Sequence, residues 1–148
     1  MCGIVGVVDS RPDSTVDPAV ITRMLKSIVH RGPDEAGTYD GGRVGLGTRR
    51  LKIIDLQGGH QPMSNEDNTV WVAFNGEIYN HAIRRQELGK TGHQFRTRCD
   101  TEVIVHEWEE HGEKCVDWLD GQFGFALWDS TSQTLMLARD RLGIKPLY

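Results

Sequence analysis

The sequence lacks long hydrophobic stretches, an excess of basic residues and a secretory signal. Its longest uninterrupted apolar run is Val70–Phe74, far short of the roughly 20 residues that a membrane-spanning helix needs. The N-terminus has no basic segment followed by an apolar core, so no signal peptide is predicted. With 17 Lys and Arg against 21 Asp and Glu, the net charge is −4, which argues against a nucleic-acid partner. We therefore expect neither a membrane nor a nucleic acid to bind this chain.

Cysteine is also scarce, and no CxxC pair is present. The chain has three cysteines, at positions 2, 99 and 115. An odd number of widely spaced cysteines is typical of reduced thiols, so a cytoplasmic location is predicted. His106 and His111 superficially resemble the ligands of a zinc-protease helix, but they are five residues apart instead of four. They would not share a helix face, and no metal site is predicted.

The remaining composition predicts one globular domain, residues 1–148. At 38% hydrophobic and 26% charged residues, the chain resembles an ordinary domain that is long enough to bury a core. No internal repeat or linker interrupts it. Residues 139–148 contain no helix-capping motif, and they end on apolar side chains without a polar tail. We therefore expect the chain to be a fragment whose domain is incomplete at the C-terminal end.

The first residues concentrate reactive chemistry. If Met1 is removed, Cys2 becomes the first residue and carries a free α-amine and a thiol on the same carbon. An α-amine titrates near ~7.7–8.0 and a thiol near ~8.5, so one residue could supply both a base and a nucleophile. A cysteine in this position is also compatible with an ordinary small side chain. The apolar residues 4–8 that follow predict a buried strand.

Three helices are predicted from capping residues and apolar periodicity. The first begins at Asp17–Pro18, where a capping side chain precedes a proline suited to the first helical position, and it ends before Gly32–Pro33. A second covers residues 80–88 and closes near a glycine. Asp100 is expected to cap the third, which ends at Gly112.

Strands are predicted in the intervening segments. Residues 37–50 alternate glycine with short apolar residues, which favours two strands that turn at 40–42. Residues 70–74, 123–128 and 135–138 are almost continuously apolar. Such strands are typical of sheets that are covered on both faces.

Two polar segments are open to a structural or a functional interpretation. Strand 70–74 runs into Asn75-Gly76-Glu77, which is either a simple turn or an anion-stabilising corner. An Asn amide beside a Gly N–H can form an oxyanion hole. Arg49-Arg50 leads into an apolar segment, and a buried arginine there would need an anionic partner from the protein or from a ligand.

Taken in order, these motifs resemble the class II glutamine amidotransferases, a group of N-terminal nucleophile hydrolases, and most closely their asparagine synthetase branch. Each motif alone is weak, but the ordered set covers nearly the whole chain. The matching segments are residues 2–6 (CGIVG), 30–34 (HRGPD), 49–56, 59–63 (GHQPM), 75–80 (NGEIYN), 100–104 (DTEVI) and 139–148. The resemblance implies an α+β fold, a four-layer αββα sandwich of two mainly antiparallel sheets between helices.

The resemblance also implies a reaction, the hydrolysis of L-glutamine to glutamate and ammonia through a thioester on Cys2. After loss of Met1, the α-amine of Cys2 would take the thiol proton through water and return it to the leaving ammonia. The Asn75 side chain and the Gly76 N–H would hold the tetrahedral oxyanion.

Substrate recognition is implied by the same resemblance. Arg50 would bind the α-carboxylate of glutamine, and Asp100, assisted by Glu77, would bind its α-ammonium group. Further backbone contacts are expected from Leu51, Ile53 and Ile54. Cys99, beside Asp100, stands where relatives commonly carry a smaller hydroxyl residue, and we interpret it as a packing residue.

No cofactor is expected for this hydrolysis. A glycine/serine loop for ATP is absent from the sequence, so ATP and Mg²⁺ are expected only for a C-terminal synthetase domain outside it, which would use the ammonia to make asparagine from aspartate. A homodimer is left open. The alternatives are the glutaminase domain of another class II amidotransferase, with a sugar-phosphate or phosphoribosyl acceptor, and an inactive glutamine-binding fragment. A generic thiol protein has only the three cysteines to support it.

Overall fold

The computed structural model describes residues 2–11, 13–52 and 58–148, which form two antiparallel sheets. The first sheet has the order β1-β3-β2, with strands β1 (Gly3–Val8), β2 (Glu35–Asp40) and β3 (Val44–Arg50). The second has the order β4-β5-β6-β7, with strands β4 (Met63–Ser64), β5 (Val70–Ile78), β6 (Gly121–Asp129) and β7 (Thr134–Arg139).

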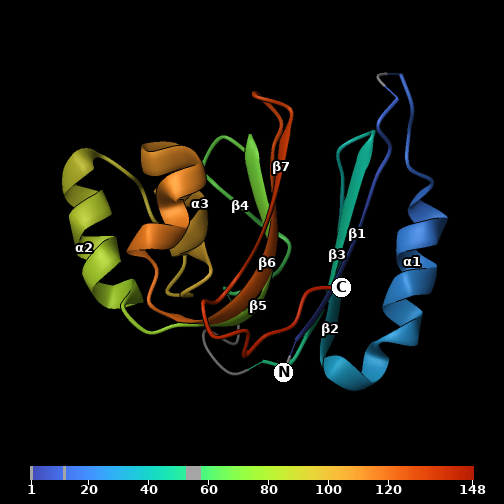
Figure 1. Ribbon diagram of the computed structural model, residues 1–148, viewed down its shortest axis with the longest axis horizontal. Coiled ribbons are helices and arrows are strands. Elements are labelled where there is room, and N and C mark those ends of the chain that lie inside the picture. Colours follow the sequence, from blue (N-terminus) through green and yellow to red (C-terminus); the bar gives the residue numbers. More distant parts are fainter. Residues whose placement is uncertain (1, 12, 53–57) are drawn as a thin grey trace.

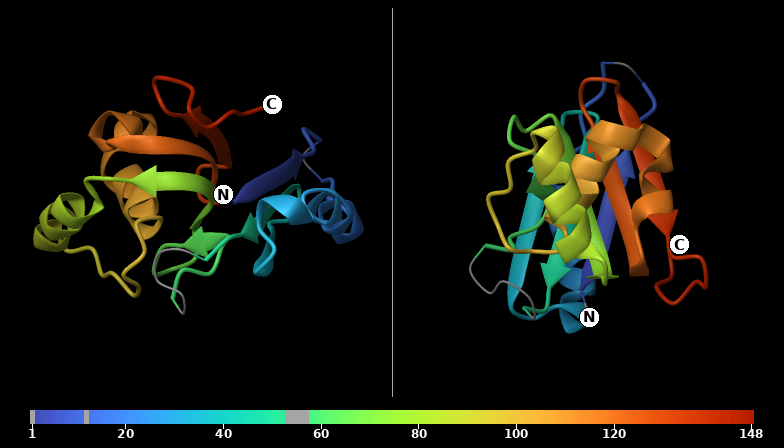
Figure 2. Two further views of the ribbon diagram at one scale, coloured as in Figure 1. Left: turned by 90° about the horizontal axis from the view of Figure 1, so that it is seen from below. Right: turned by 90° about the vertical axis from the view of Figure 1, so that its left-hand side faces the viewer.

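The two sheets face each other between helical layers (Figure 1). Helix α1 (Pro18–Ser27) covers the outer face of the first sheet, and α2 (His81–Thr91) and α3 (Glu102–His111) cover that of the second, as Figure 1 and the left view of Figure 2 show. Short 3₁₀ helices follow α1 and α3 at Val29–Arg31 and Gly112–Trp118. The αββα sandwich is therefore confirmed. Within the described ranges, no helix is long and apolar enough to cross a membrane.

Strand β5 contributes to the core on both of its faces. Val72 and Phe74 belong to the cluster that packs against α3, whereas Ala73, between them, packs with residues of the facing sheet such as Leu46. This alternation is the geometry of an extended strand, and it explains why residues 70–74 are apolar without interruption.

The expectation of two covered faces fails for the outer strands. Leu137 on β7 is 63% exposed and Val8 at the end of β1 is 48% exposed. Both strands lie at the edges of their sheets in the described part of the chain. Apolar sequence therefore does not distinguish a central strand from an edge strand here, because position in the sheet decides the burial.

Helix boundaries confirm the capping predictions at three ends, including the end of α3 at Gly112, and correct one. Asp17 caps α1 by accepting the Ala19 N–H at 2.8 Å, and α2 closes at Gly92 with φ of 113°, a conformation that favours glycine. The prediction that Asp100 caps α3 is wrong. The capping position is Thr101, which makes no side-chain cap. Asp100 does not serve as the cap because its carboxylate accepts a hydrogen bond from another element, as described below.

Candidate active site

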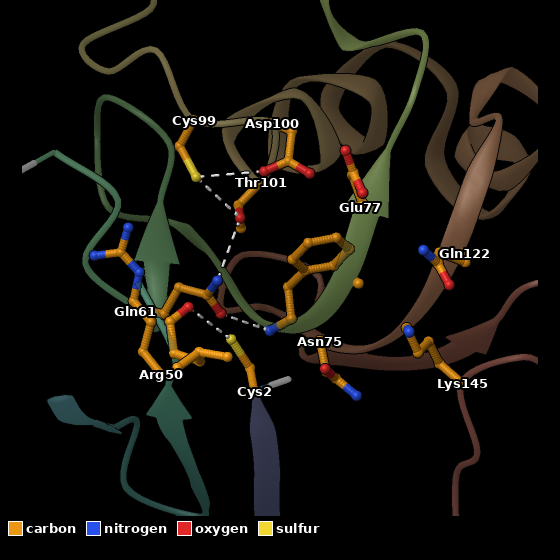
Figure 3. Close-up of a pocket in the computed structure, with 13 residues that line it drawn as sticks. Cys2, Arg50, Gln61, Asn75, Glu77, Cys99, Asp100, Thr101, Gln122 and Lys145 are labelled. Carbon is orange, nitrogen blue, oxygen red and sulfur yellow. Dashed lines mark hydrogen bonds between the residues drawn. The ribbon is translucent and has the colours of Figure 1, made fainter. Parts of the chain in front are cut away.

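A cavity of about 130 Å³ collects most of the predicted site residues (Figure 3). It lies where the start of β1, the end of β3, the end of β5 and the segment before α3 meet. Seven of the nine predicted residues line it, namely Cys2, Arg50, Leu51, Asn75, Gly76, Glu77 and Asp100. The other two, Ile53 and Ile54, lie outside the described residues.

The pairing of β1 with β3 places Cys2 at the cavity. The register sets Gly3 opposite Arg49, so the preceding residue lies beside the end of β3. The Cys2 thiol is 3.8 Å from the Leu51 carbonyl oxygen, and Arg31 donates a 3.5 Å hydrogen bond to the Cys2 carbonyl. The thiol is half-buried and belongs to the cavity wall, as a nucleophile that must meet a small substrate requires.

Asn75 and Gly76 reach the same cavity from β5. The prediction that this strand stops before residue 75 is wrong, because pairing with β6 continues to Ile78 and leaves no turn at residues 75–77. Asn75 is buried, and its neighbour Gly76 pairs with Phe123 on β6. A β-carbon on Gly76 would lie 2.2 Å from the carbonyl oxygen of Gln122. The close approach of β6 therefore requires glycine at this position. Because glycine has no side chain, the backbone of residue 76 itself faces the cavity.

Asp100 is held at the opposite end of the cavity from Cys2, near Glu77 (Figure 3). Its Oδ2 atom accepts the N–H of Ile78 at 2.9 Å, and its Oδ1 atom lies 3.5 Å from the Cys99 thiol. The carboxylate is almost fully buried. These contacts explain why it does not cap α3, and they fix the position of its carboxyl group at the cavity.

Arg50 has a protein carboxylate as its partner. It is only 4% exposed, and its Nη1 atom lies 3.3 Å from Oε2 of Glu35 on the neighbouring strand β2. Burial raises the pKa of the Glu35 carboxyl, but contacts with His60, Arg50 and Lys52 outweigh it and lower the pKa overall. Glu35 is therefore ionised at neutral pH, and it orients Arg50 while balancing its charge.

Five polar residues in the described lining of the cavity were not predicted from the sequence as site residues. They are Gln61, Cys99, Thr101, Gln122 and Lys145. Gln61 donates to the Thr101 hydroxyl at 3.3 Å and accepts the Phe74 N–H at 2.9 Å, so it ties three segments of the cavity wall together. Its place within the GHQPM motif was the available signal.

Cys99 is a packing residue, as predicted. It is buried, its thiol contacts Asp100 and the hydroxyl of Thr101 at 3.3 Å, and burial raises its pKa to about 11. It is therefore a neutral thiol at physiological pH, which distinguishes it from a nucleophile.

Lys145 reaches the cavity because Asp140 folds the C-terminal segment back. The Asp140 carboxylate accepts the backbone N–H groups of Phe123, Ile144 and Lys145 at 3.2, 2.8 and 2.9 Å. This anchors residues 140–145 to β6, and the buried Lys145 side chain points toward Gln122 (Figure 3). The described lining of the cavity thus includes two basic side chains, those of Arg50 and Lys145, and two carboxyl groups, those of Glu77 and Asp100.

Comparison with known proteins identifies the family of this chain. The sequence profile of the glutamine amidotransferase domain matches residues 1–148, the whole chain. The chain belongs to the glutamine amidotransferase domain family. Among its relatives, a glutamine-hydrolysing asparagine synthetase of Bacillus subtilis is 46% identical over the whole chain, and one of Arabidopsis thaliana is 47% identical.

The chain spans about a quarter of the length of these relatives, 24% and 25% respectively. Among solved structures, an allosteric regulatory enzyme of purine biosynthesis superposes with a TM-score of 0.76 over 99% of this chain and 38% of its own, at 21% identity. A glutamine phosphoribosylpyrophosphate amidotransferase of B. subtilis gives 0.70 over 93% of this chain and 37% of its own, at 19% identity. At these identities the superpositions establish the shared fold.

Proposed function

We propose that this amidotransferase domain hydrolyses L-glutamine to glutamate and ammonia with Cys2 as the nucleophile. One observation supports this most directly. A single cavity brings together the half-buried thiol of residue 2, the Asn75-Gly76 corner and the charged pair Arg50 and Asp100. These residues come from four separate segments, and each has the chemistry that one step of the reaction needs.

The chemical steps follow from that set. With Met1 removed, the α-amine of Cys2 accepts the thiol proton through a water molecule, and the thiolate attacks the side-chain amide carbon of glutamine. The Asn75 amide and the Gly76 N–H donate to the oxyanion that forms. The protonated amine then gives its proton to the leaving nitrogen, so ammonia departs and a thioester remains. Water attacks the thioester and releases glutamate and the free thiol.

Recognition of the substrate uses both ends of the amino acid. Asp100, with Glu77 beside it, is suited to the α-ammonium group, and Arg50 is suited to the α-carboxylate. Leu51 contributes backbone at the Cys2 end of the cavity, near the thiol. We assign similar contacts to Ile53 and Ile54. Because Glu35 already neutralises Arg50, the substrate carboxylate would share the guanidinium with it.

The fate of the ammonia is the finer part of the proposal. The relatives at 41–47% identity are glutamine-hydrolysing asparagine synthetases, which supports a C-terminal domain that uses ATP and Mg²⁺ to make asparagine from aspartate. The hydrolysis itself needs no cofactor. The described cysteines are all unpaired, which supports a reducing, cytoplasmic compartment. A sugar-phosphate or phosphoribosyl acceptor is the second candidate, favoured only by structures of low identity.

Ammonia release from glutamine by the purified chain tests the proposal, with intact mass measured on the same sample. A folded chain that begins at Cys2 is expected to release ammonia, and a Cys2→Ala variant is expected to release none. A Cys115→Ala variant is the matched control, since that thiol is buried outside the cavity. Full activity of Cys2→Ala would overturn the mechanism, and an inactive, folded, correctly processed chain would overturn the function.

A further inference from the structure

A second cluster of reactive side chains lies on the helical side of the molecule, away from the cavity. Glu66 from the β4–β5 turn, His93 from the α2–α3 connection and His106 from α3 each offer one ligand atom, and these atoms lie within 4.8 Å of one another. None of the three is among the residues that line the cavity. We propose that they form, with Glu109, a binding site for a divalent transition-metal ion of the zinc class.

The distances suit such an ion. Tetrahedral zinc with bonds of ~2.0–2.1 Å separates neighbouring ligand atoms by roughly 3.3 Å. His106 Nδ1 lies 3.5 Å from Glu66 Oε2, and His93 Nδ1 lies 3.4 Å from Glu109 Oε2. Glu109 Oε2 also lies 2.8 Å from His106 Nδ1. Glu66 is the exposed member and so is free to approach the two histidines, and two carboxylates would neutralise the charge of the ion.

The surroundings of His93 and Glu109 provide independent support. Metal-binding histidines typically donate their second ring nitrogen to a carboxylate, which fixes the ring and its tautomer. His93 has this arrangement, because its Nε2 atom lies 2.8 Å from Glu110 Oε1 while Nδ1 faces the cluster. The other oxygen of Glu109 accepts a 2.8 Å hydrogen bond from Asn65. His106 is fully buried in its helix, so its position is set by the core.

This inference revises the expectation of no metal site. That expectation rested on the spacing of His106 and His111. His111 lies outside the proposed cluster, and its ring stacks on Trp118. The proposed partners of His106, His93 and Glu66, lie 13 and 40 positions away in the sequence, so no local motif predicts them. A bound ion would cross-link the β4–β5 turn, the α2–α3 connection and α3.

Zinc chloride titration by calorimetry tests the site, on protein treated with a chelator and then freed of it. All samples carry Cys2→Ser, because an N-terminal thiol and amine would bind zinc themselves. One equivalent of zinc is expected, with affinity reduced at least ~10-fold by His93→Gln and by Glu66→Gln. His111→Gln, a histidine on the same helix, is the control and should bind normally.

Cobalt substitution gives a second readout, because a four-coordinate site produces strong visible absorption. The absence of saturable zinc binding would overturn the proposal, as would wild-type affinity in either His93→Gln or Glu66→Gln. Glu66 is exposed, so its variant is expected to fold even if the variant of His93 does not. Circular dichroism of each variant checks this.

Discussion

The carboxylate of Asp100 accepts a hydrogen bond from the backbone N–H of Ile78 at 2.9 Å, which joins the segment before α3 to the last residue of β5. Asn75 and Gly76 are part of the same strand, β5. The residue proposed to bind the α-ammonium group of glutamine thus positions the helical layer relative to the proposed oxyanion hole. The structural role and the proposed recognition role belong to the same side chain, and substitutions can separate the two.

Asp100→Asn keeps an oxygen for the Ile78 N–H but removes the negative charge. A hydrogen bond to a charged group contributes ~1.5–3 kcal/mol, so KM for glutamine is expected to rise roughly 10- to 150-fold. Asp100→Ala also leaves the Ile78 N–H without its acceptor, which should cost a further ~1–3 kcal/mol of stability. Steady-state kinetics and urea unfolding distinguish these effects, and an unchanged KM in Asp100→Asn would contradict the assignment.

Asn75→Ala removes one proposed donor to the oxyanion. Loss of such a donor typically lowers kcat by ~100- to 1,000-fold, while KM should change little because the donor acts on the transition state. Rates of ammonia release across a range of glutamine concentrations measure both constants. A large rise in KM with kcat preserved would show instead that Asn75 binds the ground state.

Gly76→Ala places a β-carbon 2.2 Å from the Gln122 carbonyl oxygen, so β5 and β6 must separate. Overpacking of this kind costs typically ~1–3 kcal/mol, and ammonia release should fall as the oxyanion corner moves. Gly89→Ala is the matched control, because its β-carbon would meet nothing within 4 Å on helix α2. That control should stabilise the protein by ~0.5–1 kcal/mol. Urea unfolding should show a lower free energy of unfolding for Gly76→Ala and a higher one for Gly89→Ala.

Alkylation should distinguish the three thiols. Burial raises the pKa of Cys99 to about 11 and that of Cys115 to about 12. The thiolate is the reactive form, so roughly a thousandth or less of each is reactive at pH 7.5. Iodoacetamide on the folded protein is expected to add one group, at Cys2, as read by peptide mass spectrometry. Comparable labelling of Cys99 under these conditions would contradict the packing role.

Asp140 makes the stability of the C-terminal segment depend on pH. Burial raises the pKa of its carboxyl, but the N–H groups of Lys145, Ile144 and Phe123 outweigh this and lower it overall. A lowered folded-state pKa gives stability that is present above the unfolded value and lost as the pH falls through the folded one. Asp140→Asn should therefore destabilise the protein most at pH 7 and least near pH 3, measured by urea unfolding. Asp117→Asn, at an exposed carboxylate, is the control.

The sequence determined the local elements and the chemistry of the site. Asp17–Pro18 predicted the start of α1 because a capping side chain and a proline act on adjacent backbone groups. The continuous apolar run in β5 predicted a strand buried on both faces. The ordered motifs indicated the amidotransferase family. They also indicated Cys2, Asn75 and Asp100 as cavity residues, because a motif can be matched residue by residue without knowledge of the fold.

Only the tertiary structure decided how distant groups are paired. Strand register placed Glu35 beside Arg50, and the fold of the C-terminal segment brought Lys145 into the cavity. Asp100 accepts a hydrogen bond from Ile78 at the end of β5 instead of capping its own helix, and His106 lies beside His93 and Glu66 instead of beside His111. Caps and periodicities act over a few residues, whereas these pairings depend on which surfaces the core brings into contact.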